Sequence, residues 1–300
     1  MRKLNRREFV RTSAFAACAT LAGTAALGIR ADNAKQQAES QGLGAAGKMP
    51  VALQVCSVQA EAARDLPGTL RRIAEMGYDG VEFAGFYGHP ADEVRGMLCE
   101  NKLTCLGSHL SLQNLLGDEF VGTAAFFRTV GARNLVVSGG TDRVLAEDGG
   151  NLFAAYLFGE LARKARAEGM RVGYHSHAPE FEHLDGSATG TAWNLFFNRT
   201  DPDVIAQLDI GNCIDSSADP YLELEKLPGR GQLVHLKAAP AGTILGEPGD
   251  VVDWQRIFRL CETVSGTEWY IIEQEGQEMD SLKASALALD NYRRIIGARS

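Results

Sequence analysis

Short apolar runs and longer amphipathic segments alternate along the chain from about residue 50 to the C-terminus. Short apolar runs bounded by polar residues or glycine are typical of buried strands, whereas apolar residues spaced three and four apart are typical of surface helices. The predicted strands are Val51–Cys56, Gly80–Phe83, Leu103–His109, Asn134–Ser138, Val172–Ser176, Val204–Asp209, Leu233–Leu236 and Tyr270–Gln274. The predicted helices lie near Leu66–Met76, Ala91–Asn101, Glu119–Val130, Leu152–Glu168, Thr191–Asn198, Pro220–Leu227, Trp254–Val264 and Ser281–Ile296.

Strands that alternate regularly with helices predict a parallel sheet covered by helices. About 250 residues follow the first predicted strand, and this length fits a single (β/α)8 TIM barrel of the α/β class better than two small domains. An open, doubly wound sheet is the alternative, but no G-x-G-x-x-G turn follows the first strand. We therefore predict a single-domain barrel over residues 50–300.

The N-terminal residues do not share this pattern. Arg6-Arg7 lies in a twin-arginine motif, and a weakly apolar, Ala-rich stretch from Thr12 to Leu27 follows it. A basic flank and a short apolar core predict a twin-arginine export signal over residues 1–33, with an uncleaved membrane anchor as the alternative. Residues 34–49 are small and polar and predict a flexible linker. We expect a periplasmic protein with no stable membrane span after processing.

Charge and cysteine content limit the partners that the mature chain can have. Residues 1–31 hold six of the 30 basic residues and one of the 38 acidic residues, so the remainder has a net charge of −13. Such a surface repels phosphate backbones, and nucleic acid is therefore not expected as a partner. The cysteines show no C-x-x-C spacing, which favours neither a disulfide framework nor a zinc ribbon. A homo-oligomer is compatible with the sequence.

Ionisable side chains end most of the predicted strands. In strand order they are Glu82, His109, His175 with His177, Asp209, His235 and Glu273. The C-terminal ends of TIM-barrel strands form one face of the barrel, where active sites lie. Any one of these groups could be structural, because a buried charge can also be satisfied by pairing. Together, imidazoles and carboxylates on one rim predict an enzyme with a divalent-metal site.

A series of motifs in this order resembles the xylose isomerase-like barrels, the sugar phosphate isomerase and epimerase group, over about residues 50–297. The motifs are Gly77-Tyr78-Asp79-Gly80-Val81-Glu82, Gly173-Tyr174-His175-Ser176-His177, Leu208-Asp209-Ile210-Gly211-Asn212, His235-Leu236-Lys237, Gly246-Glu247-Pro248-Gly249-Asp250-Val251-Val252-Asp253-Trp254 and Ile272-Glu273-Gln274. The resemblance implies a divalent ion held by a Glu ending strand five, an Asp after strand six, a His on strand seven and a Glu on strand eight. Asp209, His235 and Glu273 match the last three positions, and His175 stands at the first.

Two positions depart from the family's pattern. With His175 in place of the usual Glu, one of the two carboxylates that move protons in the sugar epimerases is missing, and Glu180 or Glu182 on the next loop could substitute for it. Asn212 stands where the family has a substrate-contacting His, three residues after the strand-six Asp. Either His175 or His177 could complete the metal shell, while the other faces the substrate.

The chemistry of such a site can be argued from its groups. A metal that chelates a carbonyl oxygen and a neighbouring hydroxyl stabilises an enediolate as a Lewis acid. A base must then remove the proton next to the carbonyl. Glu273 could act both as metal ligand and as this base. The other acid–base candidates are Glu82, His109 and His177.

Three functions follow from these groups. The first is a divalent-metal-dependent isomerase or epimerase that acts on a sugar or keto-sugar, with one Mn, Co, Zn, Fe or Mg ion. The second is a lyase or dehydratase of a keto-glycoside or cyclic polyol ketone, which the missing carboxylate favours because elimination needs only one base and one acid. The third is a non-catalytic carbohydrate-binding barrel. A type IV apurinic endonuclease is not favoured, because its trinuclear zinc site needs more ligands than the sequence supplies.

The predicted substrate contacts lie on the same strand ends and loops. They are Asn212, Lys237 and Glu182. For Lys237 an outward-facing position is equally compatible with the sequence, because side chains alternate between the two faces of a strand.

Overall fold

The structure of the protein is a computed structural model that describes residues 49–139, 145, 147–182 and 190–299. The predicted signal peptide, residues 1–33, lies outside the described residues, and so does the predicted linker apart from Met49. The export signal and the periplasmic location therefore stay predictions.

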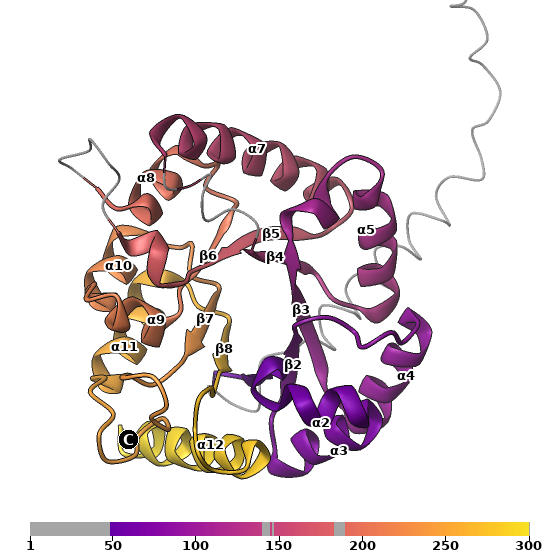
Figure 1. The fold of residues 1–300 in the computed structure, drawn as a ribbon, viewed down its shortest axis with the longest axis vertical. Coiled ribbons are helices and arrows are strands. Elements are labelled where there is room, and N and C mark those ends of the chain that lie inside the picture. Colours follow the sequence, from indigo (N-terminus) through magenta and orange to yellow (C-terminus); the bar gives the residue numbers. More distant parts are fainter. Residues whose placement is uncertain (1–48, 140–144, 146, 183–189, 300) are drawn as a thin grey trace, which may run out of the picture. The chain divides into compact units, whose positions relative to one another are not determined.

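Eight parallel strands form a ring at the centre of the barrel (Figure 1). They are β1 (Val51–Gln54), β2 (Gly80–Phe83), β3 (Thr104–Ser111), β4 (Asn134–Gly139), β5 (Arg171–His175), β6 (Ile205–Gln207), β7 (Leu233–Leu236) and β8 (Trp269–Ile272). Hydrogen bonds join them in the order β6-β5-β4-β3-β2-β1-β8-β7. Between β6 and β7 the ring is bridged where His235 N–H donates to Leu208 O at 3.0 Å. The prediction of a single-domain TIM barrel is confirmed.

Helices cover the outside of this ring (Figure 1). They are α2 (Gln59–Arg64), α3 (Leu66–Met76), α4 (Ala91–Asn101), α5 (Glu119–Val130), α7 (Asp148–Ala167), α8 (Ala192–Arg199), α9 (Ile210–Asp215), α10 (Pro220–Lys226), α11 (Trp254–Leu260) and α12 (Ser281–Gly297). Local signals set their ends. At α3, the Asp65 side chain accepts the N–H of Gly68 at 3.0 Å, and Gly77 adopts the left-handed conformation that ends the helix. None of the helices in the described part of the chain is long and apolar enough to cross a membrane.

Three strands are shorter than predicted. β8 ends at Ile272 and not at Gln274. β1 ends at Gln54, because the chain turns there into a 3₁₀ turn, Val55–Val58. β6 ends at Gln207, because Asp209 instead caps the N-terminus of α9, a helix that the apolar pattern did not predict. Asp209 therefore lies on the loop just beyond the strand.

The interior of the barrel has an apolar layer near the N-terminal ends of the strands and a polar layer near their C-terminal ends. Residues two apart on a strand point to the same side, so each strand contributes to both layers. The apolar layer contains Ala52, Leu106, Val136, Ile205, Leu233 and Ile271. The polar layer includes the buried residues two positions later along the chain in four cases, Gln54, Gln207 and His235 on their strands and Glu273 directly after β8. The polar side chains of this layer therefore lie at the mouth of the barrel, where the strands end.

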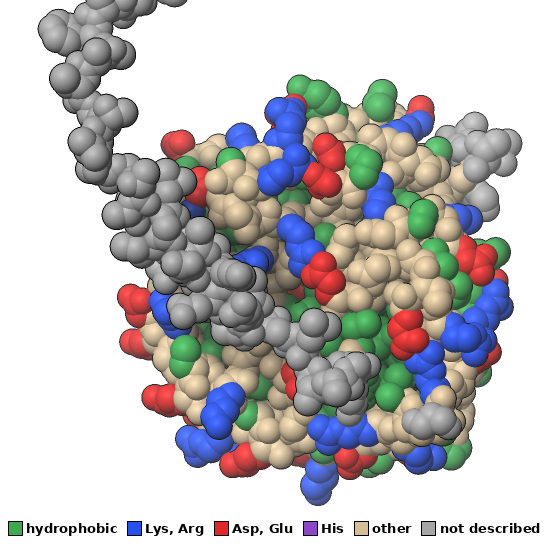
Figure 2. Space-filling model, turned by 180° about the vertical axis from the view of Figure 1, so that it is seen from behind, with side chains coloured by type: hydrophobic (Ala, Val, Ile, Leu, Met, Phe, Trp, Pro, Cys, Tyr) green, Lys and Arg blue, Asp and Glu red, His purple; other side chains and the backbone are tan. Residues whose placement is uncertain are grey.

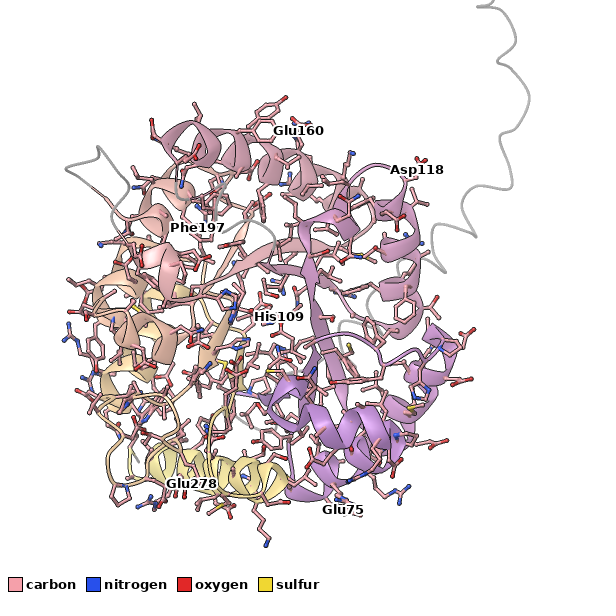
Figure 3. All side chains as sticks on the ribbon, in the orientation of Figure 1. Glu75, His109, Asp118, Glu160, Phe197 and Glu278 are labelled. Atoms are coloured by element: carbon pink, nitrogen blue, oxygen red, sulfur yellow. The ribbon has the colours of Figure 1, made fainter. Side chains whose placement is uncertain are left out.

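Charged side chains on the outside of the barrel lie around its edge, whereas the polar groups inside lie near its centre. Figure 3 places His109 near the centre of the ring, whereas Glu75, Asp118, Glu160 and Glu278 lie at its edge. On the opposite face, seen in Figure 2, Lys and Arg side chains are interspersed with Asp and Glu.

Candidate metal centre

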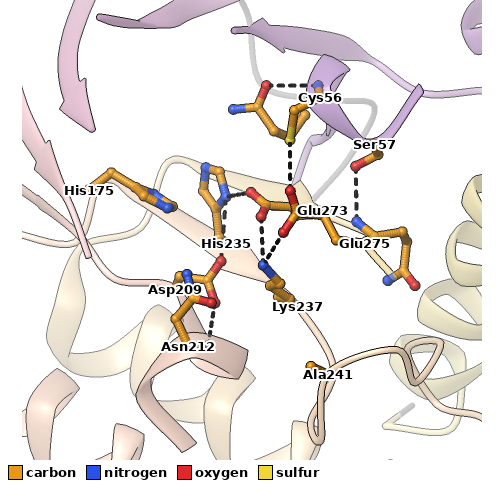
Figure 4. A network of polar contacts seen from close by, with 12 residues as sticks. Cys56, Ser57, His175, Asp209, Asn212, His235, Lys237, Ala241, Glu273 and Glu275 are labelled. Atoms are coloured by element: carbon orange, nitrogen blue, oxygen red, sulfur yellow. Dashed lines mark hydrogen bonds and ion pairs between the residues drawn. The ribbon is translucent and has the colours of Figure 1, made fainter. Parts of the chain in front are cut away.

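Four of the predicted metal ligands meet at the mouth of the barrel. His175 ends β5, Asp209 lies two residues beyond β6, His235 is in β7, and Glu273 directly follows β8. One ligand atom from each lies within 4.8 Å of those of the other three, and all four residues are buried. Imidazole nitrogens and carboxylate oxygens at this spacing suit one divalent cation. We call these four residues the metal-ligand cluster (Figure 4).

His235 is hydrogen-bonded on both sides of its ring. Nδ1–H donates to Glu273 Oε2 and Nε2–H donates to Glu82 Oε2, each at 2.8 Å. Burial by itself lowers the pKa of His235, but the hydrogen bonds and charges of Glu273 and Glu82 outweigh this and raise it to about 10. The metal-free protein therefore holds an imidazolium between two carboxylates. A cation bound at Nδ1 would replace that proton, while Glu82 would still accept Nε2–H and fix the orientation of the ring.

Glu82, on β2, lies beneath His235 with no exposed surface. Its carboxylate accepts N–H groups from Gln54 at 2.9 Å and from Gln207 at 2.8 Å, and it lies 3.2 Å from His109 Nε2. Burial raises the pKa of Glu82, but His109 and His235 outweigh it and lower the pKa to about 2. Glu82 is thus an ionised anchor for His235, and its oxygens are engaged with protein groups rather than with the mouth.

Asp209 shows that the metal-ligand cluster fits a cation. Its Oδ1 accepts the N–H of Asn212 at 2.8 Å, and its own N–H donates to Ser176 Oγ at 2.9 Å. Its Oδ2 is buried, accepts no hydrogen bond from the described residues, and lies 3.9 Å from His235 Nδ1. Burial and repulsion from Glu273 raise the pKa of Asp209 to about 7. An unpaired buried carboxylate oxygen is unfavourable, and a cation between these ligands would pair it.

His175, rather than His177, belongs to the metal-ligand cluster. His175 Nδ1–H donates to Gln207 Oε1 at 2.9 Å, which leaves the Nε2 lone pair available to a metal. Burial and the neighbouring His109 lower the pKa of His175 well below its ordinary value, so the ring is neutral. The half-buried His177 ring packs edge-on against His175 with ring centres 4.9 Å apart. His177 thus lies beside the cluster.

Lys237 lies in the site and not on the outward face of the barrel. Its Nζ donates to Glu273 Oε1 at 3.0 Å and to Glu275 Oε2 at 2.6 Å (Figure 4). Burial alone lowers the pKa of Lys237, but Glu273 and the other nearby carboxylates raise it overall, so the ammonium stays charged. Burial raises the pKa of Glu273, but His235 and Lys237 bring it well below its ordinary value. Glu273 is therefore ionised, with one oxygen on His235 and the other on Lys237.

Glu180, Glu182 and Asn212, on the loop after β5 and on α9, are not part of the metal-ligand cluster. Glu180 is buried, and its two oxygens accept the Tyr174 hydroxyl at 2.6 Å and the His177 N–H at 2.8 Å. It stabilises the turn and does not replace the missing strand-five carboxylate. Glu182 is exposed at the end of this turn. The Asn212 side chain donates to a backbone carbonyl just after β5 at 3.2 Å, which ties α9 to that strand end.

Gln54 and Gln207 were not among the predicted site residues. Gln207 Oε1 accepts from both His109 Nε2 and His175 Nδ1 at 2.9 Å, and the two glutamines together donate to Glu82. Both are polar residues at the C-terminal end of a buried strand, which is the signal that revealed the histidines and carboxylates. An amide is a weak metal ligand, so a search for ligands passes over it. These glutamines join three ionisable groups into one network beneath the metal-ligand cluster.

Comparisons with known proteins give a family and a fold. A model of the family described as xylose isomerase-like TIM barrel matches residues 70–294. A sugar phosphate isomerase/epimerase from Parabacteroides distasonis ATCC 8503 has a TM-score of 0.67 at 21% identity, covering 83% of this chain and 96% of that one. A D-allulose 3-epimerase from Methylomonas sp. has a TM-score of 0.61 at 14% identity, with coverages of 82% and 98%. An AP endonuclease, family 2, from Brucella melitensis has a TM-score of 0.62 at 18% identity, with coverages of 81% and 99%. At these identities the likeness shows the fold alone, and no curated protein matches the chain.

Proposed function

The chain belongs to the xylose isomerase-like TIM barrel family, and on this premise we propose that it is a divalent-metal-dependent isomerase or epimerase of a sugar or keto-sugar. The observation that carries the proposal is the buried Asp209 Oδ2, which has no hydrogen-bond donor in the described chain and lies beside His235 and Glu273 at the barrel mouth. This oxygen lies together with potential ligand atoms of His175, His235 and Glu273, within 4.8 Å of one another. A cation site at the catalytic end of the fold accounts for it.

Four residues would hold the ion, and their neighbours prepare them for it. His175 is neutral with its Nε2 free, Asp209 presents Oδ2, His235 is oriented by Glu82, and Glu273 is ionised. When bound, the ion would supply Lewis-acid polarisation of a substrate carbonyl. The protein fixes the ligands before binding, so little reorganisation is needed in the reaction.

Proton transfer needs groups on both sides of the bound substrate. Glu273 is ionised, and its position at the end of β8 suits it to take the proton next to the carbonyl. Lys237, bonded to Glu273 and Glu275, keeps that carboxylate in place and supplies a positive charge for the developing enediolate oxygen. His177, two residues beyond the end of β5 and packed against His175, is the second group that would return the proton.

One observation favours a lyase as the second candidate. Because Glu180 is bonded to Tyr174 and to the His177 backbone, the described residues at the end of β5 offer imidazoles, and no carboxylate among them is placed at the mouth. An epimerase works with two bases of similar strength, whereas an elimination needs one base and one acid. A carboxylate on β8 and an imidazole on β5 suit the second arrangement as well as the first.

Metal analysis followed by NMR of a sugar and keto-sugar panel in deuterated water tests these functions. Deuterium incorporated next to a carbonyl supports the isomerase or epimerase, and release of an aglycone supports the lyase. Glu273→Gln should slow exchange by about 100-fold or more, since it removes the base. The matched control is Glu75→Gln, at an exposed position on α3. A sugar that binds without exchange or turnover favours the carbohydrate-binding barrel. An unchanged exchange rate in Glu273→Gln contradicts the assignment of Glu273 as the base.

A further inference from the structure

A cavity of about 670 Å³ lies between the loops that follow β1 and β8. One wall is formed by the 3₁₀ turn after β1 and by α2, and the other by residues 274–281, which lead into α12. Both loops follow the C-terminal ends of neighbouring strands, on the same face of the barrel as the metal-ligand cluster. The volume is within the range of small-molecule sites. We call this space the β1–β8 cavity.

The β1–β8 cavity lies next to the candidate active site, because two of its lining residues lie close to Glu273. Cys56 and Glu275 line it, and their ligand atoms lie within 4.8 Å of each other and of a Glu273 oxygen. Glu275 is also bonded to Lys237 at 2.6 Å, and Lys237 to Glu273 at 3.0 Å. Figure 4 shows Cys56, Glu275 and Lys237 grouped around Glu273. A substrate held at the metal-ligand cluster can therefore extend past Glu275 into this cavity.

The lining contains both polar and apolar side chains, and its charged groups are acidic. Glu61, Glu275 and Asp280 contribute carboxylates, and the described lining contains no Lys or Arg. A phosphate group in this cavity would meet carboxylates without a cation to pair it. The cavity therefore selects against phosphorylated groups, although the fold is shared with proteins described as sugar phosphate isomerases/epimerases.

Two polar groups of the lining lack partners in the described chain. Gln274 is 98% buried, and its Nε2 donates no hydrogen bond, although its Oε1 accepts one from Gln277 at 3.3 Å. Ser281 Oγ is also without a partner. An amide donor, a hydroxyl and several carboxylates match the mixed donors and acceptors of sugar hydroxyls. The small side chains of Ala60 and Ala63 leave space beside these groups.

We propose that the β1–β8 cavity is a second sugar subsite, which binds an uncharged, polyhydroxylated group joined to the reacting sugar. The inference rests on the proposed function, because it assigns the reacting sugar to the metal-ligand cluster. It names the substrate class as an unphosphorylated glycoside or disaccharide instead of a monosaccharide phosphate. The glycosidic neighbour would lie over Glu275, between α2 and the start of α12.

Direct binding measurements test the subsite without relying on turnover. Isothermal titration of the metal-loaded protein compares glucose, glucose 6-phosphate and the neutral disaccharides maltose, cellobiose and sucrose. We expect at least one disaccharide to bind at least tenfold more tightly than glucose, and glucose 6-phosphate to bind no more tightly than glucose. If every disaccharide binds as weakly as glucose, or if the phosphate binds best, the proposal is wrong.

A variant that fills the cavity locates the effect. Ala60→Trp places a large side chain in the lining from an exposed position on α2, and it should lower the ratio of disaccharide to glucose affinity about tenfold. Ala125→Trp, at an exposed position on α5 outside the lining, is the matched control and should keep the ratio. Ser281→Ala, a smaller change in the same cavity, should lower the ratio about threefold. An equal loss for glucose and disaccharide in both cavity variants would overturn the subsite.

The two proposals can fail separately. If deuterium exchange occurs with free keto-sugars but the affinity ratio stays near one, the isomerase or epimerase remains and the subsite is rejected. If disaccharides bind through the β1–β8 cavity but no sugar exchanges deuterium, the subsite remains and the barrel binds carbohydrate without isomerising it.

Discussion

Replacing Glu82 by Gln should destabilise the metal-free protein although the side chain keeps its shape. Glu82 is fully buried and ionised, and it accepts hydrogen bonds from Gln54, Gln207 and His235. Its pKa falls from 4.5 to about 2 in the folded protein, and this shift corresponds to about 3 kcal/mol of stability at neutral pH. Removing one partner of a buried ion pair typically costs about 3–5 kcal/mol, which agrees. We therefore expect Glu82→Gln to lower the free energy of unfolding by about 3 kcal/mol at pH 7.

The pH dependence of this loss has a defined sign. Because the folded pKa of Glu82 lies below the unfolded value, its contribution is complete above about pH 4.5 and disappears as the pH falls toward 2. The difference between wild type and Glu82→Gln should therefore be constant from pH 5 to 7 and shrink below pH 4.5. A neutral group at this position can show no such titration.

Urea unfolding of the metal-free proteins at several pH values measures the loss of unfolding free energy and its dependence on pH. Glu75→Gln, an exposed change of the same chemistry on α3, is the matched control and should stay within about 0.5 kcal/mol of wild type. A loss below about 1 kcal/mol in Glu82→Gln at pH 7, or a difference that grows toward acid, would refute the assignment of Glu82 as the ionised anchor of His235.

The remaining predictions concern the metal ligands and the apolar layer. In the metal-free protein the pKa of His235 is raised to about 10, so its contribution to the free energy of unfolding is complete below about pH 6.5 and is lost as the pH rises from 6.5 to 10. Urea unfolding measures this loss, and a free energy that stays constant over this range would show that the imidazolium is absent. Asp209→Asn should weaken metal binding by more than about 100-fold and raise the stability of the metal-free protein at pH 8, because it removes an unpaired buried charge; calorimetry with and without metal checks both signs. Ile271→Ala should cost about 2–5 kcal/mol of unfolding free energy and leave metal affinity within about threefold, since it opens space in the layer beneath the site.

The strand-five end distinguishes this barrel from the pattern that its family implies. The neutral His175 replaces a carboxylate ligand, and Gln207 fixes its tautomer from the next strand. Such an exchange removes one negative charge from the metal shell. It also removes one carboxylate base, and the nearby Glu180 does not compensate because it is bonded inside its own turn. On the proposed function, the outcome of the reaction would depend on how His177 and Glu273 share the proton transfers.

Much of the fold and of the metal-ligand cluster could be predicted from the sequence. The alternation of apolar runs and amphipathic segments can be read from short stretches of the sequence. In a parallel barrel this alternation also determines the topology, because the C-terminal ends of all strands lie on one rim. This rule made Asp209, His235 and Glu273 candidates, because each lies at or near the C-terminal end of a buried strand, and the resemblance to the family identified them as metal ligands. Gln54 and Gln207 carry the same positional signal, but amides resemble ordinary buried polar groups, and the sequence does not show which partners they meet.

Only the tertiary structure decided the contacts across the ring. Glu82 and His235 are 153 positions apart, and their 2.8 Å contact depends on the registers of β1, β2, β7 and β8 together. Lys237 lies beyond the last residue of β7, where the alternation of side chains along the strand no longer sets its direction. Its ion pairs with Glu273 and Glu275 hold the side chain in the site. The sequence by itself determined the barrel and the groups at its mouth, because both depend on short-range periodicity. Tertiary packing decided which of those groups are paired, buried or left with a free oxygen, because pairing energies depend on distances between segments far apart in the chain.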